Sequence, residues 1–313
     1  MKLKEFKQNK SLVSLYVDSS GLANKKEFNN CVYSITKQRT AVDLVVFYNN
    51  LSDAEVSELE GILKDPLLTI VRLDEENNPV TEELKLGEGD ASVNYTLEKT
   101  TASNFSQLFN LGFNYAAAND YEFYSVIEQD DTYAIHWFEY AERYALEEEG
   151  NDVFLPLIRH TVNGQYHSLI NEASWVEGMS EEAGVTDINL LLKFNSINPL
   201  GAVFRVESIK DSSDEIDGAY LPVKESMKIT HSYEFFLRMI YDDLKVKTIP
   251  RIGYELMITP KDEFNEASSK IPQNISQMPA DKGGVSTPEV QFYVDLAKKE
   301  YFFEEDRKKA FEG

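Results

Sequence analysis

The sequence predicts an α/β protein in which helices flank a mostly parallel, mixed sheet, followed by a linker and a C-terminal helix. Short apolar runs alternate with amphipathic segments along the first half of the chain, and several runs end in loop-forming residues such as Gly and Asn. The 313 residues are 42% hydrophobic and 12% aromatic, which is sufficient for one large core or two modest ones. This alternation is typical of doubly wound layer structures.

The first part of the chain contains one strand–helix–strand unit and the start of another. Apolar runs at 11–17 and 42–50 predict strands, and the segment between them carries apolar residues at helical spacing. That length suits one parallel βαβ unit. Ser52, with Glu55 three residues later, predicts a capping box at the start of a second helix, and 67–73 predicts a third strand.

The middle of the chain leads from an irregular segment into a helix and a strand. Residues 75–98 are polar and lack periodicity, which predicts a loop. Residues 102–119 place apolar side chains on one helical face behind a Ser or Asn cap, and 121–127 has the pattern of a buried strand. A further helix is expected at 134–147.

The following segments continue the same domain. Residues 153–160 and 202–211 predict strands, 232–243 predicts a helix, and 248–258 predicts a further extended segment. We therefore expect 1–258 to form a single domain.

The last part of the chain has a different composition. Residues 259–286 are rich in Pro, Gly, Ser and Asn, which predicts a linker or an arm on the surface. Residues 287–313 then predict an amphipathic helix that begins with Thr287 as N-cap and Pro288 in the first turn. This helix either docks on its own domain or contacts another subunit.

Charge and cysteine content restrict the class of protein. The chain has 31 basic and 54 acidic residues, a formal charge of −23, and so strong a negative field disfavours a nucleic-acid partner. The single Cys31 cannot form an internal disulfide and fits a reducing compartment. No signal peptide and no membrane-spanning run is evident, so we expect a soluble, cytoplasmic protein.

Three acids, Glu128, Asp130 and Asp131, directly follow the predicted strand 121–127. Clustered carboxylates repel one another and cost desolvation energy unless a cation or hydrogen-bond donors meet them. In open parallel sheets, ligands collect outside the carboxyl ends of strands. The acids therefore either bind a metal at this edge or cap a helix that begins at Thr132.

Three stretches together resemble family 2 glycosyltransferases, which have the GT-A fold. The second stretch, residues 104–133, contains Asn110-Leu111-Gly112 before the acids. The third stretch, residues 233–254, contains Leu237-Arg238 followed by a strand with Ile-Pro. The likeness spans roughly residues 10–257, and it depends on the order and spacing of the stretches, which are LVSLYVDSSGLANKKEFNNCVYSITKQ, NFSQLFNLGFNYAAANDYEFYSVIEQDDTY and YEFFLRMIYDDLKVKTIPRIGY.

The resemblance implies a metal-dependent, inverting transfer of a sugar from a nucleoside diphosphate, most simply a UDP-sugar, to an unknown hydroxyl acceptor. Glu128-Gln129-Asp130 stands where the family has its Asp-x-Asp metal motif, with Asp131 beside it. Mn²⁺ or Mg²⁺ takes oxygen ligands and neutralises the charge of the leaving diphosphate. The resemblance therefore makes Glu128, Asp130 and Asp131 metal ligands.

Other site residues follow from the same resemblance. The donor is expected near Asp18, Tyr48, Asn110 and Glu128, at or close to the ends of the predicted strands. Where many members have an acidic base before the late helix, this chain has His231-Ser232. His231 itself or Glu234 is expected to deprotonate the acceptor, since either type can serve as a general base.

The chain departs from the family pattern in several places. Phe47 or Tyr48 stands near the usual base-binding Asp, Phe109 replaces an Arg, Ser232 replaces an acid, and Leu256 replaces a His that serves some members as a metal ligand. Two accounts fit these departures. The chain is either a diverged enzyme or a pseudoenzyme, a non-catalytic structural or assembly protein such as a virion component.

The remaining histidines and tryptophans give weaker signals. His136, His160 and His167 show neither an H-E-x-x-H pattern nor another paired metal spacing. His160 follows a predicted strand, where it could meet an acceptor or a phosphate or bond to the backbone. Trp137 and Trp175 either stack on a sugar ring or pack in the core.

Overall fold

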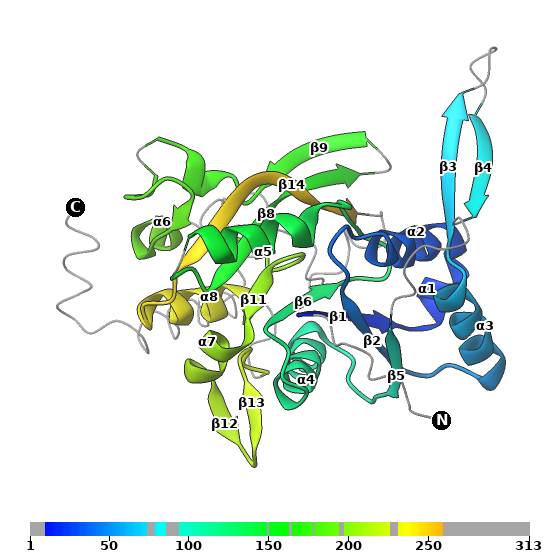
Figure 1. Cartoon of the computed structure of the whole chain (residues 1–313), viewed down its shortest axis with the longest axis horizontal. Coiled ribbons are helices and arrows are strands. Elements are labelled where there is room, and N and C mark those ends of the chain that lie inside the picture. The colour runs from blue at the N-terminus through cyan, green and yellow to red at the C-terminus, as the bar shows by residue number, and fades with distance from the viewer. Residues whose placement is uncertain are drawn as a thin grey trace, which may run out of the picture.

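A computed structural model shows one large mixed sheet with helices on both faces (Figure 1). The predicted linker at 259–286 and the predicted helix at 287–313 lie outside the described residues. Those described are 10–73, 79–85, 94–148, 150–162, 165–177, 179–193, 197–225 and 231–258.

The sheet has the strand order β10-β14-β8-β11-β6-β1-β2-β5, with β7 paired to β14 and β9 paired to β8. Along the main path, the pairs β14–β8, β6–β1, β1–β2 and β2–β5 are parallel and the other three are antiparallel. The predicted mixed, mostly parallel sheet is confirmed. Its strands are β1 (Ser11–Val17), β2 (Asp43–Tyr48), β5 (Tyr95–Lys99), β6 (Phe123–Ile127), β7 (Thr132–Tyr133), β8 (Val153–Val162), β9 (Gln165–Ile170), β10 (Val185–Thr186), β11 (Val203–Arg205) and β14 (Val246–Ile258).

Helices cover the two faces of this sheet and create two apolar cores. One core packs α2, α3 and α5 against alternate strand residues such as Leu15, and the other packs α4, α6, α7 and α8 against the residues between them, such as Leu12. This alternation is the period of two expected of strands buried on both faces. The helices are α1 (Ser19–Ala23), α2 (Lys25–Thr36), α3 (Asp53–Lys64), α4 (Phe105–Ala118), α5 (Trp137–Glu147), the 3₁₀ turn Ala173–Trp175, α6 (Ile188–Lys193), α7 (Val206–Asp211) and α8 (His231–Tyr241).

The caps expected from the sequence start two of these helices. Ser52 and Glu55 form the predicted capping box of α3, in which each side chain bonds to the backbone of the other residue. Asn104 caps α4 by accepting a 3.0 Å hydrogen bond from the backbone N–H of Gln107. Both interactions satisfy donors that a helix start leaves open.

The strand predicted at 67–73 is present, but it does not join the main sheet as expected. β3 (Leu67–Leu73) pairs antiparallel with β4 (Pro79–Lys85) in a two-stranded ribbon that projects from the body of the molecule (Figure 1). A short connection permits this pairing, whereas a parallel partner requires a crossover of a dozen or more residues. The third parallel strand is instead β5, at the edge beside β2.

The predicted loop at 75–98 was therefore also wrong in part, because it contains β4 and most of β5. β5 is an edge strand with mostly exposed side chains, so its polar sequence carries no apolar period. The predicted strand 202–211 is likewise shorter than expected, since β11 ends at Arg205 and α7 follows directly. A hairpin of β12 (Asp214–Ile216) and β13 (Ala219–Leu221) was not foreseen.

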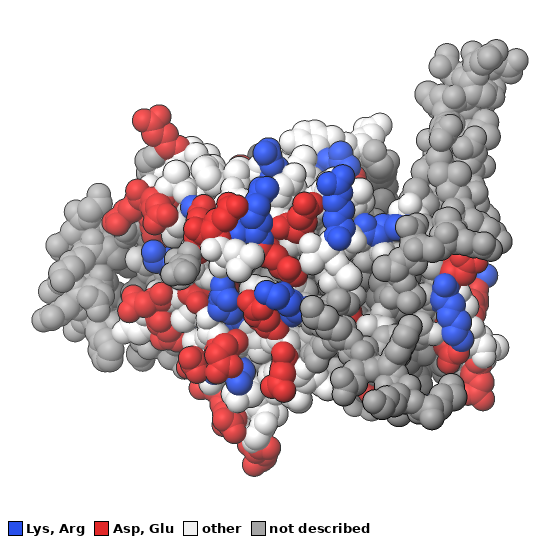
Figure 2. Space-filling view, in the orientation of Figure 1, with Lys and Arg blue, Asp and Glu red and all other residues white. Residues whose placement is uncertain are grey.

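The surface carries both signs of charge. Figure 2 shows acidic side chains spread over the visible face, with Lys and Arg side chains among them. None of the described helices combines the length and apolar character that crossing a membrane requires.

Candidate functional site

The loops that follow β1 and β6 begin side by side at one edge of the sheet. β1 and β6 are parallel neighbours, with Leu15 beside Ile127. Asp18 directly follows β1, and Glu128 directly follows β6. Tyr48 ends β2 as the register partner of Val17, so it lies at the same edge. The fold thus places Asp18, Tyr48 and the acids at the same edge of the sheet.

Gln129 connects the two loops. Its Nε2 donates to Asp18 Oδ1 and to Ser20 Oγ, each at 3.1 Å, and its Oε1 accepts from the Asp18 backbone N–H at 3.2 Å. No local pattern singles out Gln129, because its role depends on a partner 111 positions away. The middle residue of the acidic turn therefore fixes the turn against the loop after β1.

Asp18 is held as a carboxylate. Burial opposes its ionisation, but hydrogen bonds from the Ser20 hydroxyl, the Gln129 amide and the backbone N–H groups of Ser20 and Gly21 together hold the pKa of Asp18 below its ordinary value. The same backbone bonds make Asp18 the N-cap of α1. A half-buried negative charge therefore stands beside the acidic turn.

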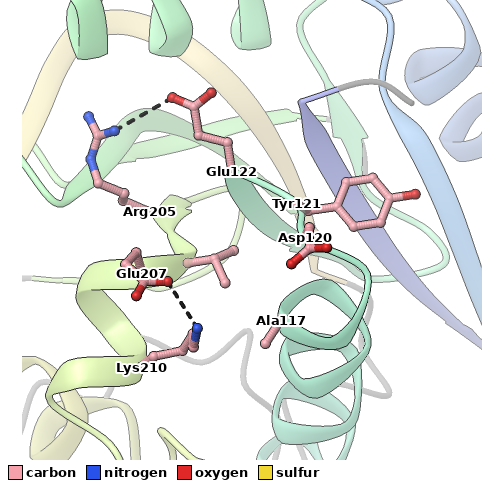
Figure 3. A pocket seen from close by; sticks show the side chains of 8 residues that line it. Ala117, Asp120, Tyr121, Glu122, Arg205, Glu207 and Lys210 are labelled. Carbon is pink, nitrogen blue, oxygen red and sulfur yellow. Dashed lines mark hydrogen bonds and ion pairs between the residues drawn. The ribbon is translucent and has the colours of Figure 1, made fainter. Parts of the chain in front are cut away.

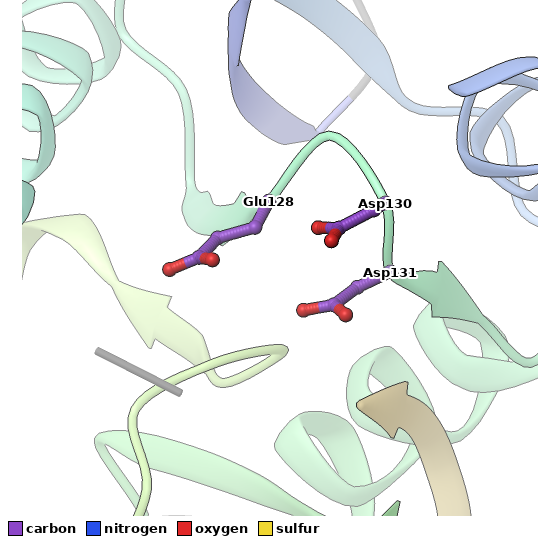
Figure 4. A group of neighbouring side chains, drawn as sticks. All are labelled: Glu128, Asp130 and Asp131. Carbon is purple, nitrogen blue, oxygen red and sulfur yellow. The ribbon is translucent and has the colours of Figure 1, made fainter. Parts of the chain in front are cut away.

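The three acids form one cluster on the turn after β6. Each of Glu128, Asp130 and Asp131 offers one carboxylate oxygen, and these oxygens lie within 4.8 Å of one another. Figure 4 shows the three side chains leaving the turn on the same side. Glu128 and Asp130 are partly exposed, whereas Asp131 is fully buried.

Asp131 is anchored to β14. Its Oδ2 accepts a 2.8 Å hydrogen bond from the Tyr254 hydroxyl, and its Oδ1 accepts a 2.9 Å bond from the Met257 backbone N–H. Burial, followed by the charge of Asp131, raises the pKa of Tyr254 well above its ordinary value. The phenol therefore stays protonated. Its hydroxyl donates a hydrogen bond to Asp131, and this bond holds the carboxylate in one orientation.

The helix-cap interpretation of the acids is wrong. Thr132 and Tyr133 form β7, which pairs with β14, and the next helix, α5, begins at Trp137 with His136 as its N-cap. No acid of the turn accepts a bond from the first turn of α5 among the described contacts. The three carboxylates therefore do not precede a helix that begins at Thr132.

The donor set fits a hard divalent cation. Mg²⁺ and Mn²⁺ prefer carboxylate oxygens, and two ligands on an octahedral Mg²⁺ at about 2.0–2.1 Å lie about 3–4 Å apart. The carboxylate oxygens, which lie within 4.8 Å of one another, need only small side-chain rotations to reach this spacing. Each carboxylate oxygen has two lone pairs, so the bonds to Tyr254 and Met257 leave Asp131 able to bind a cation.

Asn110 bonds to the segment that follows β13. It lies within α4, and its side chain bonds both to the N–H (3.0 Å) and to the C=O (2.8 Å) of Val223. Asn114, one turn later, pairs in the same way with Tyr220. The two amides thus fasten β13 and the residues after it to α4.

The two candidate bases have different surroundings. Glu234 is fully buried, and its Oε1 lies 3.1 Å from Arg238 Nε and 3.5 Å from Lys224 Nζ. His231 is the first residue of α8, and its ring centre lies 5.3 Å from that of Phe105 at the start of α4. Because α4 leads from its far end into β6, its start lies at the edge of the sheet that carries the acids.

Two of the departures from the family pattern, Phe109 and Leu256, are packed into the core. Phe109 contacts the rings of Tyr124, Phe204 and Phe235 at centroid distances of 5.2–5.4 Å. Leu256 is also fully buried, and the pairing of Glu255 with Thr132 places it next to Asp131 in register. At these two positions, apolar side chains therefore stand where the resemblance places polar groups.

A small hollow of about 250 Å³ lies at the opposite edge of the sheet (Figure 3). Arg205 pairs across it with Glu122 at 3.6 Å, and Lys210 pairs with Glu207 at 2.9 Å. Asp120 adds another acid to its lining. Since both cations already face carboxylates, this hollow does not favour a diphosphate.

Comparison with known proteins supports the fold. No protein-family model matches the chain, and no curated protein matches it. Among solved structures, TarS from S. aureus matches with a TM-score of 0.51 at 14% identity, over 82% of this chain and 38% of TarS. TarS 1–349 in complex with UDP matches with a TM-score of 0.52 at 14% identity, over 96% of this chain and 74% of that one.

A third structure comes from another organism. The mannosyltransferase PcManGT from Pyrobaculum calidifontis, in complex with GDP-Man and Mn²⁺, matches with a TM-score of 0.50 at 10% identity. That match covers 80% of this chain and 57% of the mannosyltransferase. The chain thus spans well under half of the longer TarS structure and somewhat more than half of PcManGT. These neighbours are glycosyltransferases, and the chain shares their mixed α/β, GT-A-like fold.

Proposed function

We propose that the chain is a glycosyltransferase that moves a sugar from a nucleoside diphosphate to a hydroxyl acceptor. The observation that carries this proposal is the cluster of Glu128, Asp130 and Asp131 at the carboxyl edge of a GT-A-like sheet. Ligands of open α/β sheets collect at that edge. Neighbours of the same fold bind UDP in one case and GDP-Man with Mn²⁺ in another, which supports the same class of donor here.

Glu128 and Asp130 would hold a divalent ion, with Asp131 as a third, anchored ligand. When bound, the ion supplies Lewis-acid stabilisation of the charge that develops on the leaving nucleoside diphosphate. The anchoring of Asp131 by Tyr254 and Met257 reduces the reorganisation needed to form the site. Gln129 adds to this by fixing the turn against the loop after β1.

The donor would lie across the ends of β1, β2 and β6. Asp18 and Tyr48 lie at this edge. They would contact the nucleoside and the diphosphate. Asn110 would act indirectly, because both polar atoms of its amide are already bonded to Val223. We assign it a positioning role for the segment that carries Lys224.

His231 is the better placed base for the acceptor hydroxyl. Both candidates are buried, but Glu234 is ion-paired with both Arg238 and Lys224, so its carboxylate is engaged by protein cations. His231 lies at the start of α8, beside the end of α4 that is nearest to the acidic edge. An imidazole there would accept the proton as the oxygen attacks the sugar, with inversion at the anomeric carbon in a single displacement.

Two buried positions favour a second function, a non-catalytic assembly role on the same fold. Phe109 and Leu256 stand where the resemblance places an Arg and a metal-binding His, and both are 0% exposed. A protein that uses this fold only for assembly tolerates such replacements. An enzyme must supply the lost polar groups from other residues. The two functions differ in whether the protein turns over nucleotide sugars.

The test is turnover of UDP- and GDP-hexoses by the full chain with Mn²⁺, with and without a panel of hydroxyl acceptors. We expect slow release of nucleoside diphosphate without an acceptor and faster release with a suitable one. Asp130→Asn is expected to abolish release, whereas Glu122→Gln, an acid at the opposite edge, is expected to leave it intact. Absence of release by the wild type for every donor and acceptor would favour the non-catalytic role, and equal, measurable release by wild type and Asp130→Asn would contradict the assignment of Asp130 as a metal ligand.

A further inference from the structure

Two exposed isoleucines lie side by side next to the start of α5. β7 pairs antiparallel with β14, and the pairing continues past β7, because the Ala134 N–H donates to the Gly253 carbonyl at 2.9 Å. The next residues in each direction, Ile135 and Ile252, are therefore neighbours. They are 46% and 47% exposed, so a pair of large apolar side chains faces solvent here.

Tyr140 of α5 brings two arginines to the same place. The guanidinium carbon of Arg143 lies 5.1 Å from the centre of the Tyr140 ring, and that of Arg251 lies 5.8 Å from it. A cation over an aromatic ring is attracted to the ring, which holds both groups beside α5. Arg251 also directly precedes Ile252. The group consisting of Ile135, Tyr140, Arg143, Arg251 and Ile252 is called the α5 patch below.

The two arginines of the α5 patch differ from the others in their charge partners. Neither Arg143 nor Arg251 has a carboxylate within ion-pair distance in the part of the chain that the structure describes, and both are exposed. Every other arginine with a described side chain faces an acid, in the pairs Arg39–Glu139, Arg159–Glu255, Arg205–Glu122 and Arg238–Glu234. In a chain with 54 acidic and 31 basic residues, this patch therefore favours a partner that carries carboxylates.

The chain itself offers a segment with the matching chemistry. Residues 301–306 read Tyr-Phe-Phe-Glu-Glu-Asp, three aromatic residues followed by three acids. In the helix that the sequence predicts for 287–313, Tyr301, Glu304 and Glu305 share one face, because residues three and four apart are neighbours on a helix. An aromatic ring would shield the isoleucines from water, and the carboxylates would form charge-assisted hydrogen bonds with the guanidinium groups.

We propose that the segment 287–313 binds the α5 patch of its own chain. Tyr301 packs on the isoleucine pair, and Glu304 and Glu305 face Arg143 and Arg251. The inference does not depend on the proposed transferase function. Ile252 lies two residues before Tyr254, whose hydroxyl donates to Asp131, so the bound segment covers the strand that supports the acidic turn.

The length of the connection permits binding within one chain. β14 ends at Ile258, six residues after Ile252, which is about 20 Å along a strand. Residues 259–300 connect Ile258 to Tyr301 and number 42. A coil of that length has a root-mean-square span of about 32–39 Å. The segment therefore reaches the patch, and the connection gives it a higher effective concentration than a second copy has in dilute solution.

The experiment is hydrogen–deuterium exchange of the full chain, followed by mass spectrometry of the peptides that contain 301–306 and the α5 patch. We expect the amides of 301–306 to be protected in the wild type. Arg143→Glu/Arg251→Glu is expected to speed their exchange about tenfold, because attractive charge pairs become repulsive. Adding Glu304→Arg/Glu305→Arg to that variant is expected to restore protection, because the two charges are exchanged and remain complementary.

A matched control changes the net charge by the same amount elsewhere. Lys26→Glu/Lys245→Glu reverses two exposed lysines outside the patch and is expected to leave the exchange of 301–306 unchanged. Thermal melting of each variant checks that it is folded.

Three results would overturn the proposal. The first is unprotected exchange of 301–306 in the wild type. The second is protection that survives the arginine reversal or is not restored by the exchange of charges. The third is protection that rises with protein concentration together with a dimer in sedimentation, because the occupant of the patch would then be a second copy.

Discussion

The Tyr254 hydroxyl donates a 2.8 Å hydrogen bond to Oδ2 of Asp131, and both side chains are 0% exposed. This contact joins β14 to the turn after β6. It explains how a buried carboxylate is tolerated at the edge of an apolar core, because hydrogen bonds replace the water that the charge has lost. It also makes β14 part of the candidate metal site, although no side chain of β14 is among the acids.

Tyr254→Phe should therefore affect both stability and ion binding. Loss of a buried hydrogen bond to a carboxylate is expected to lower the free energy of unfolding by about 1–3 kcal/mol, measured by urea denaturation. It should also weaken Mn²⁺-dependent nucleotide binding. Tyr233→Phe is the matched control, because Tyr233 is a buried phenol whose hydroxyl donates to the Leu191 carbonyl on the other face of the sheet. Equal loss of Mn²⁺ affinity in both variants would contradict the role of Tyr254.

Gln129→Ala should change the acid stability of the protein. The folded-state pKa of Asp18 is below its ordinary value, so Asp18 contributes stability that is present above the unfolded-state pKa and is lost as the pH falls through the folded-state pKa. Removal of the Gln129 hydrogen bond raises the folded-state pKa. The midpoint of acid unfolding, followed by circular dichroism, should therefore move to higher pH. Gln107→Ala, which removes an exposed amide in the first turn of α4, should leave the midpoint in place.

Gly112→Ala and Gly61→Ala should have opposite effects. A Cβ on Gly112 would lie 2.5 Å from Tyr124 Oη and 2.8 Å from Ser14 Oγ, so α4 must shift away from the sheet, at a cost of about 1–3 kcal/mol. A Cβ on Gly61 meets nothing within 4 Å, and alanine there should stabilise α3 by about 0.5–1 kcal/mol. Thermal denaturation measures both changes. A stabilising Gly112→Ala would show that α4 does not approach β1 this closely.

The two candidate bases can be separated by kinetics. If His231 accepts the proton, His231→Gln should lower kcat by about 10²–10⁴-fold with little change in KM for the donor. Glu234→Gln should mainly lower stability, because it leaves Arg238 and Lys224 without their shared carboxylate. The pH profile of kcat gives a second readout, since the limb assigned to the base should disappear only in His231→Gln. A His231→Gln variant with full kcat would exclude this residue as the base.

Local sequence patterns predicted the site only in part. The order of strands and acids was sufficient to place Asp18, Tyr48 and Glu128 at one edge, because parallel strands end on the same side of a sheet. The anchoring of Asp131 was not predictable, since its partner Tyr254 lies 123 positions away.

The errors in the fold have a related cause. Strand β5 was interpreted as loop because an edge strand exposes polar side chains and loses the apolar period. Strand β3 was recognised as a strand but was assigned to the wrong sheet, since apolar periodicity does not determine which strand it pairs with. Helix starts were more predictable. Ser52 with Glu55, and Asn104 with Gln107, are interactions within one turn of the chain.

We propose that the turn with Glu128, Asp130 and Asp131 binds a divalent cation and a diphosphate. Calorimetric titration of the full chain with UDP and with GDP, first with Mn²⁺ and then with the metal chelated, tests it most directly. We expect binding that requires Mn²⁺ and is lost in Asp130→Asn. Absence of binding for every nucleoside diphosphate, or equal binding with and without the metal, would contradict the account.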